Sequence, residues 1–152
     1  MNLEERGRGM KRELSGSLVL DTGALLELIY STEKGLKLKD ALKSEKVQAN
    51  ISELTLTELM YILCRKIGEK EAQDRVGYLL DSGYVILHED SKLVELAAEY
   101  KCRRGISLAD CFALALAKKI SSPAIFARRE DELLEEMSRE PFDVKILFLE
   151  DF

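Results

Sequence analysis

The chain has 152 residues, a formal net charge of −5, and a composition that is 46% hydrophobic and 34% charged. This length fits one domain with one hydrophobic core, and two prolines with nine glycines exclude a fibrous or low-complexity protein. The acidic balance argues against a broad nucleic-acid-binding face, because such faces are rich in Lys and Arg, but it leaves room for a local basic groove.

The cysteine and histidine content excludes several kinds of site. Three cysteines without a CxxC spacing indicate neither a disulfide framework nor a thiolate zinc site. The single histidine, His88, cannot supply both a general base and a set of metal ligands. Acid–base or metal chemistry must therefore rest on carboxylates.

The start of the chain is charged and lacks the apolar segment of a signal peptide. No apolar run approaches the roughly 20 residues that span a bilayer, so we expect a cytoplasmic protein without a membrane contact. Residues 1–16 are rich in charge and glycine, which predicts a flexible N-terminal arm, and residues 17–152 are predicted to form the single domain.

Short apolar runs alternate with helical periodicity along the domain. The predicted strands cover residues 17–21, 47–52, 84–88, 123–127 and 144–149. The predicted helices cover residues 22–31, 36–45, 54–68, 69–83, 91–105, 107–121 and 130–139. Strands separated by helices of this length need crossover connections, which predicts a three-layer α/β/α domain with a mostly parallel central sheet.

Three acidic residues occupy similar places in this pattern. Asp21 follows the first strand, and Glu58 and Asp110 are each predicted in the first turn of a helix. Each has a structural explanation as a helix cap: Asp21 before Thr22, Glu58 in a capping box that begins at Thr55, and Asp110 in a looser box after Ser107. Helix N-termini nevertheless cluster at the carboxyl edge of a parallel sheet, where ligands bind, so the three carboxylates are expected to meet.

Carboxylates that meet without a cation repel one another and raise each other's pKa. A divalent ion at the centre would remove this cost, and an all-oxygen ligand set favours Mg²⁺ or Mn²⁺ over zinc. The chemistry that such a site indicates is metal-assisted hydrolysis of a phosphodiester.

Three segments together resemble the PIN-domain nucleases, and in particular the short VapC-like toxins of toxin–antitoxin operons. They are LVLDTGALLELI around Asp21, ISELTLTELMYIL around Glu58, and GISLADCFALALAKK around Asp110. The resemblance implies a PIN fold and Mg²⁺- or Mn²⁺-dependent cleavage of single-stranded RNA, with Asp21, Glu58 and Asp110 as metal ligands. It also implies that Thr22 and Ser107 support the pocket.

The family resemblance further implies partners for a toxin. These are a small antitoxin protein that plugs the acidic groove and a second copy of the chain in a homodimer. A PIN nuclease of housekeeping RNA processing would carry the same sequence features, and a short open reading frame beside the gene would favour the toxin.

The chain departs from the family at its fourth acidic position, where a Thr-x-Asp or Thr-x-Asn element usually follows the penultimate strand. Without gaps, Ala127 replaces the Thr and Arg129 the acid; a shifted loop would instead bring in Asp131, which we favour, or Glu130. Arg128 and Arg129 are candidate phosphate contacts, since a guanidinium at this place either competes with the metal or holds substrate.

Other classes of protein fit the sequence less well. An aspartyl-phosphate phosphotransferase of the haloacid-dehalogenase type needs a second acid two residues after the first, and Gly23 stands there. A response-regulator receiver needs a paired acid cluster near the first strand. The remaining alternative is a catalytically inactive PIN-fold module that binds RNA or protein, which the altered fourth position would explain.

Overall fold

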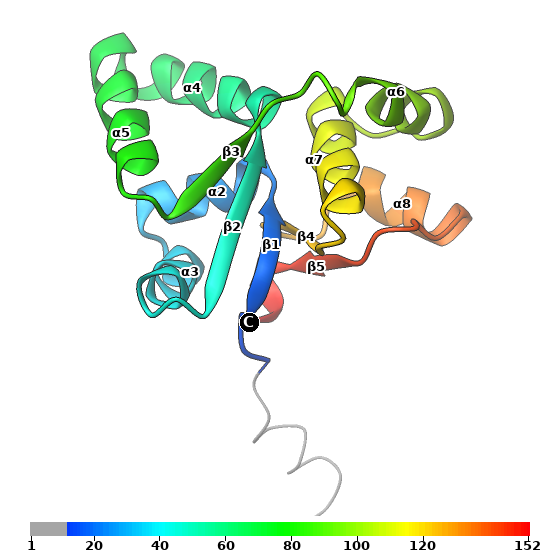
Figure 1. Ribbon diagram of the computed structural model, residues 1–152, viewed down its shortest axis with the longest axis horizontal. Helices are drawn as coiled ribbons and strands as arrows, with labels where there is room; N and C mark the ends of the chain where they lie inside the picture. Colours follow the sequence, from blue (N-terminus) through cyan, green and yellow to red (C-terminus); the bar gives the residue numbers. More distant parts are fainter. Residues whose placement is uncertain (1–11) are drawn as a thin grey trace, which may run out of the picture.

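The structure is a computed structural model that describes residues 12–152, in which five strands form a single sheet. The strands are β1 (Gly16–Leu20), β2 (Val47–Ser52), β3 (Val85–His88), β4 (Ala124–Phe126) and β5 (Ile146–Phe148). Their order across the sheet is β3-β2-β1-β4-β5, and every neighbouring pair is parallel (Figure 1). The predicted parallel sheet is confirmed.

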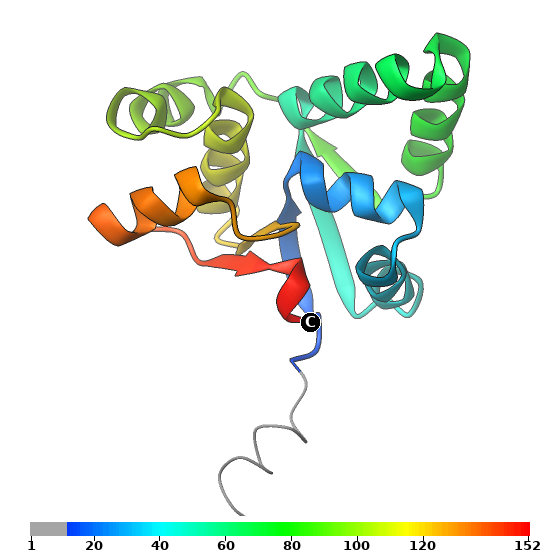
Figure 2. The same ribbon diagram turned by 180° about the vertical axis from the view of Figure 1, so that it is seen from behind.

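Helices connect the strands and cover the sheet. They are α2 (Thr22–Tyr30), α3 (Glu33–Lys43), α4 (Glu53–Ile67), α5 (Glu69–Asp81), α6 (Val94–Arg103), α7 (Leu108–Lys119), α8 (Asp131–Arg139) and the short 3₁₀ helix η1 (Leu149–Asp151). Figure 1 shows α6 and α7 together on one side of β1, and Figure 2, from behind, shows α2 and α3 on the other side. The predicted three-layer α/β/α architecture is therefore confirmed.

Alternating side chains of the central strand divide the core into two clusters. Leu18 and Leu20 of β1 pack with buried leucines of α2, α3 and α4, whereas Val19 packs with α6 and α7. The α7 side is lined largely by alanines and leucines, which are buried from Ala109 to Ala117. Small side chains allow α7 to lie close to the sheet, and this closeness brings its N-terminal end to the carboxyl edge of β1.

The strand order creates a crevice at that edge. The chain passes from β1 to β2 and β3 on one side and then returns to place β4 and β5 on the other side of β1. The connections that leave β1 and β4 therefore diverge, and an open parallel sheet binds its ligands at such a switch point. Asp21 is the first residue after β1.

Two helices begin earlier than the sequence predicts. Helix α3 begins at Glu33 because Thr32 accepts a hydrogen bond from the Gly35 N–H (3.0 Å). Helix α4 begins at Glu53 because Ser52, the last residue of β2, accepts from the Thr55 N–H (3.1 Å). The predicted capping box at Thr55 is wrong, and Glu58 lies in the second turn of α4 rather than the first.

The beginning of the described chain also differs from the prediction. Residues 1–11 of the predicted arm lie outside the described residues, but Leu14 is buried in the core and β1 already begins at Gly16. Of the helices in residues 12–152, none is long and apolar enough to cross a membrane.

Candidate active site

Asp21 caps helix α2 and is anchored to strand β4. Its Oδ1 accepts a hydrogen bond from the Ala24 N–H (2.7 Å) and so caps α2, while its own N–H donates to the Ile125 carbonyl of β4 (3.1 Å). These contacts hold the carboxylate at the switch point between β1 and β4, with 8% of the residue exposed. The predicted cap is confirmed, and it places a titratable carboxyl group in a nearly closed environment.

The surroundings of Asp21 disfavour its charged form. Burial raises the pKa of its carboxyl to about 8, although the Ala24 N–H opposes the rise. The negative charges of Asp110, Glu130 and Glu58 raise the pKa further. Carboxylates from four parts of the fold therefore lie near one another here: the end of β1, the N-terminal half of α4, the first turn of α7, and the loop before α8.

Asp110 is the second carboxylate with a strongly shifted pKa. Ser107 caps α7 by accepting from the Asp110 N–H (3.1 Å), which turns the first residues of the helix toward the edge of the sheet. Burial and the charge of Glu130 raise the pKa of the Asp110 carboxyl to about 6, with a further contribution from Glu58, while the Ser107 hydroxyl opposes the rise. The predicted Ser107 cap is confirmed.

The chemistry of these side chains fits a hard divalent cation. The buried Asp21 and the half-buried Asp110, held near other carboxylates, are stabilised as anions by an added positive charge, and oxygen donors suit Mg²⁺ or Mn²⁺. The Thr22 hydroxyl, beside Asp21, is buried and has no hydrogen-bond partner within residues 12–152. No three His, Cys, Asp or Glu side chains in the described part of the chain already stand as a complete ligand set, so the half-buried Glu58 and the exposed Glu130 would have to turn inward.

Glu130 and Asp131, the two candidates for the fourth acidic position, are both exposed at the beginning of α8. Glu130 directly precedes the helix, and its charge raises the pKa of both Asp21 and Asp110. Asp131 is the first residue of α8 and is not among the main causes of either shift. The charge of Glu130 therefore makes it a further candidate ligand beside the predicted Asp131.

Arg129, the residue that stands at the family's acidic position, is bound to the end of the chain. Its guanidinium donates to both carboxylate oxygens of Asp151 (2.7 Å each) and to Glu150 (2.9 Å), and it lies over the ring of Phe148. The Arg129 N–H also donates to Glu150 (3.0 Å). These contacts fasten the loop after β4 to η1, while Arg128 beside it is exposed.

Close packing between two small residues completes the site. A Cβ atom added at Gly23 would lie 3.0 Å from the Cβ of Ala127 and 3.4 Å from Oδ2 of Asp21. Ala127 therefore occupies the family's Thr position with a side chain that just fits against Gly23. The β4–α8 loop can approach Asp21 only because both positions are small.

The sequence of the chain matches a known protein family. A sequence profile of the PIN domain matches residues 18–140. The chain therefore belongs to the PIN-domain family, as the three motifs predicted. A search of curated proteins found no match by sequence.

Several solved structures share the fold. A VapBC complex from Salmonella typhimurium, solved bound to DNA, aligns with a TM-score of 0.65 at 15% identity over 88% of this chain and 98% of that chain. A toxin–antitoxin complex from Klebsiella pneumoniae gives 0.60 at 17% identity over 87% and 97%. VapC20 from Mycobacterium tuberculosis, described as a toxin that cleaves the sarcin–ricin loop, gives 0.60 at 19% identity over 78% and 93%.

Proposed function

We propose that the protein is a metal-dependent endoribonuclease that hydrolyses phosphodiester bonds of single-stranded RNA with Mg²⁺ or Mn²⁺. The observation that carries this proposal is a pair of carboxyl groups, the buried Asp21 and the half-buried Asp110, whose pKa values are raised to about 8 and about 6. Such a pair is costly in a protein that never binds a cation. Membership of the PIN-domain family and toxin neighbours with the same fold support nuclease chemistry.

Each residue has a distinct part in the proposed site. Asp21 and Asp110 would hold the metal from rigid positions at two helix N-termini, and Glu58 and Glu130 would complete the ligand set. When bound, the metal activates a water and neutralises charge on the scissile phosphate. The Ser107 hydroxyl holds the first turn of α7 through the Asp110 N–H, and the unpartnered Thr22 hydroxyl beside Asp21 would bind a water of the metal.

Substrate binding is proposed to use the remaining free cation of the loop. Arg128 is exposed in the loop that precedes Glu130 and can pair with an RNA phosphate. The guanidinium of Arg129 is engaged by Asp151 and Glu150, so we assign it to holding the loop rather than to the phosphate. The net charge of −5 agrees with a narrow contact to single-stranded RNA rather than a broad duplex-binding face.

The fold neighbours support a toxin of a toxin–antitoxin pair, and we propose that it acts in the cytoplasm. Two of them were solved as toxin–antitoxin complexes, and their chains are covered almost completely by this one. We propose a small antitoxin as partner and a homodimer as the assembled form. A short open reading frame beside the gene favours this role, and its absence favours housekeeping RNA processing.

A cleavage assay tests the proposed activity. Labelled single-stranded RNA is incubated with the wild-type protein and with Asp21→Asn and Asp110→Asn, in Mn²⁺ or in EDTA. We expect the wild type to cut only with Mn²⁺, and each variant to lose at least about 100-fold in rate, because each removes a proposed ligand from the metal. Cutting in EDTA, or unchanged cutting by both variants, refutes the proposal.

The alternative of an inactive binding module is favoured by Ala127 and Arg129 at the fourth position. It predicts that the wild type binds the same RNA in a gel-shift experiment without cutting it in Mn²⁺. The two functions are thus separated by one protein preparation and one labelled RNA.

A further inference from the structure

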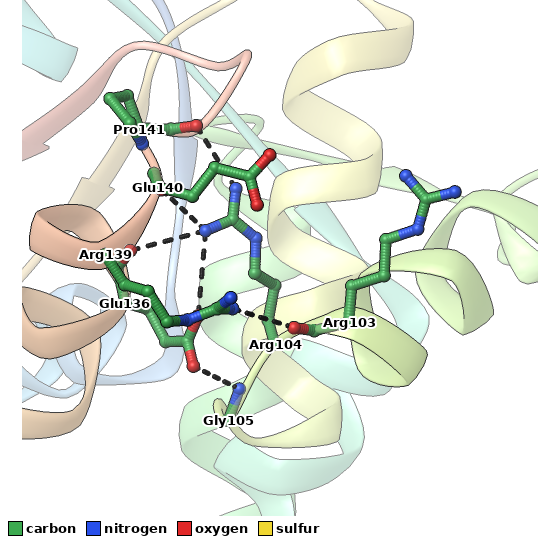
Figure 3. Close-up of polar contacts among 7 residues, drawn as sticks. All are labelled: Arg103, Arg104, Gly105, Glu136, Arg139, Glu140 and Pro141. Atoms are coloured by element: carbon green, nitrogen blue, oxygen red, sulfur yellow. Dashed lines mark hydrogen bonds and ion pairs between the residues drawn. The ribbon is translucent and has the colours of Figure 1, made fainter.

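A clamp of charged side chains joins the loop before α7 to the end of α8 (Figure 3). We define the clamp as Arg104, Gly105, Glu136 and Arg139. The side chains of Arg104 and Glu136 are only 8% and 14% exposed, and Nη1 of Arg104 lies 3.6 Å from Oε2 of Glu136. Charged residues this deeply buried are uncommon and usually have a structural or functional reason.

Arg104 binds backbone carbonyl groups at the C-terminal end of α8 and just after it. One guanidinium nitrogen, Nη1, donates to the carbonyl oxygens of Glu140 (2.6 Å) and Glu136 (3.3 Å), and Nη2 donates to that of Pro141 (3.1 Å). The guanidinium also lies 4.0 Å from the ring centroid of Phe142. The planar, forked donor set of Arg serves three carbonyls at once, which a Lys ammonium cannot do in this geometry.

Glu136 makes the reciprocal contacts from α8. Its Oε1 accepts from the Gly105 N–H (2.9 Å), and its Oε2 accepts from Arg139 (2.7 Å). Arg139 in turn donates to the Arg103 carbonyl (2.9 Å). The Gly105 N–H and Arg139 hold the pKa of Glu136 below its usual range, so the carboxylate is charged and the clamp is closed at neutral pH.

The clamp connects the two segments that carry Asp110 and Glu130. Gly105 stands two residues before Ser107, which caps the helix that presents Asp110. Glu136 stands on α8, and Glu130 directly precedes that helix. Leu133 is the one fully buried residue of α8 and Met137 is partly buried beside the same core cluster, so apolar packing of this helix is limited and the polar contacts add to it.

We propose that Arg104 and Glu136 are positioning residues that set the separation between Asp110 and Glu130, and thereby the affinity of the site for its divalent metal. This inference rests on the proposed function. Buried ion pairs contribute little net stability but hold a defined geometry, which is the property that a set of metal ligands requires.

Two conservative variants and a matched control test the clamp. Glu136→Gln removes the charge that faces Arg104 and Arg139, and Arg104→Lys keeps the charge but loses the forked contacts. Glu71→Gln makes the same chemical change in the exposed Glu71–Arg75 pair of α5 (3.3 Å). Circular dichroism establishes that each protein is folded, and titration calorimetry measures its Mn²⁺ affinity without any RNA.

We expect both clamp variants to bind Mn²⁺ about 10-fold more weakly than wild type, the lower end of the effect of groups that orient metal ligands. The same variants should lose kcat with little change in KM, while Glu71→Gln matches wild type in every measurement. If the folded clamp variants bind Mn²⁺ as tightly as wild type, the proposed role of the clamp is wrong and the proposed nuclease function still stands. Absence of Mn²⁺ binding by the wild type itself overturns the proposed function, and the clamp with it.

A measurement on the wild type alone covers the case in which a clamp variant does not fold. Coupling between two sites is reciprocal, so a clamp that tightens the metal site must itself be tightened by the metal. We expect Mn²⁺ to slow hydrogen exchange of the Gly105 amide, which lies on Glu136, by at least about 5-fold, the lower end of typical coupling between sites. Unchanged exchange at Gly105 in Mn²⁺-saturated protein contradicts the proposal.

Discussion

Two features of the Asp21 environment have opposite effects on the charge of its carboxyl group. As the cap of α2 it accepts the Ala24 N–H and should be charged, yet its burial near Asp110, Glu130 and Glu58 raises its pKa. Such a carboxylate lowers the stability of the metal-free fold at neutral pH. This instability has a measurable pH dependence.

The first prediction concerns Asp21→Asn in EDTA. The pKa of Asp21 is 3.8 in an ordinary environment and about 8 in the folded protein, so between these pH values the folded state holds a proton that the unfolded chain has released. Its contribution to the free energy of unfolding therefore falls as pH rises from about 4 to about 8. Asn keeps the cap without the charge, so the variant should melt about 5 °C above wild type at pH 8 and close to it at pH 4.

Melting curves by circular dichroism check this prediction, with Asp74→Asn as the control because Asp74 is exposed on α5. A wild type that melts as high as Asp21→Asn at pH 8 would show that the buried carboxylate costs nothing. The pKa of Asp21 in the folded protein would then be close to its ordinary value.

The second prediction concerns the contact between Gly23 and Ala127. Gly23→Ala places a Cβ 3.0 Å from that of Ala127, so the β4–α8 loop must move away from Asp21 and take Glu130 with it. We expect about a 10-fold loss of RNA cleavage in a folded protein, since small displacements at a reacting site cost rate. Gly77→Ala in α5 is the matched control, because nothing lies within 4 Å of its added Cβ. Full activity of Gly23→Ala would show that the position of the β4–α8 loop does not affect catalysis.

At the scale of the elements, α4 is held by a residue far away in the sequence. Asp90, which follows β3, accepts from the Glu53 N–H (2.9 Å) and the Leu54 N–H (2.8 Å), and its own N–H donates to Glu53 (2.9 Å). Two free N–H groups at the beginning of α4 are thus satisfied from outside the helix. The same contacts fix the helix that presents Glu58.

The third prediction concerns these contacts of Asp90 with the beginning of α4. Asp90→Ala should lower the free energy of unfolding by about 1–2 kcal/mol, the usual cost of losing a capping carboxylate. Urea titration measures the change, and Asp74→Ala on the exposed face of α5 provides the comparison. A loss no larger than that of Asp74→Ala would mean that Ser52 alone caps α4.

The sequence predicted those parts of the site whose signals are local. Asp21 and Asp110 lie where a strand end and a Ser-x-x-Asp pattern placed them, because a cap needs only residues within one helical turn. Glu58 was placed in the wrong turn because two overlapping patterns compete: Ser52 three residues before Thr55, and Thr55 three residues before Glu58. The first prevails because β2 ends directly at Ser52, with no loop between strand and helix.

Contacts over long sequence distances were not predictable in this way. Asp90 lies 37 residues from Glu53, and Glu136 lies 31 residues from Gly105. Arg129 is fastened to η1, an element that the sequence did not indicate, so its pairing with Asp151 could not be predicted. Each of these details depends on which segments the folded sheet brings side by side.

For the whole molecule, the strand order brings the parts of the site together. The switch between β1 and β4 brings Asp21, the N-terminal end of α7 and the loop before α8 to one edge of the sheet. Three regions of the chain thus meet there only when the whole domain is folded. A metal bound at that edge would bridge them, so metal binding and folding should reinforce one another.

The location of the metal is the most direct test of this account. A crystal of the wild-type protein soaked in Mn²⁺ and measured at the manganese absorption edge locates the ion without assuming any function. We predict an anomalous peak in contact with the carboxylates of Asp21 and Asp110, completed by Glu58 or Glu130, and its loss in Asp110→Asn. A fully soaked crystal with no peak at the carboxyl edge of β1, or a peak held elsewhere on the chain, would contradict it.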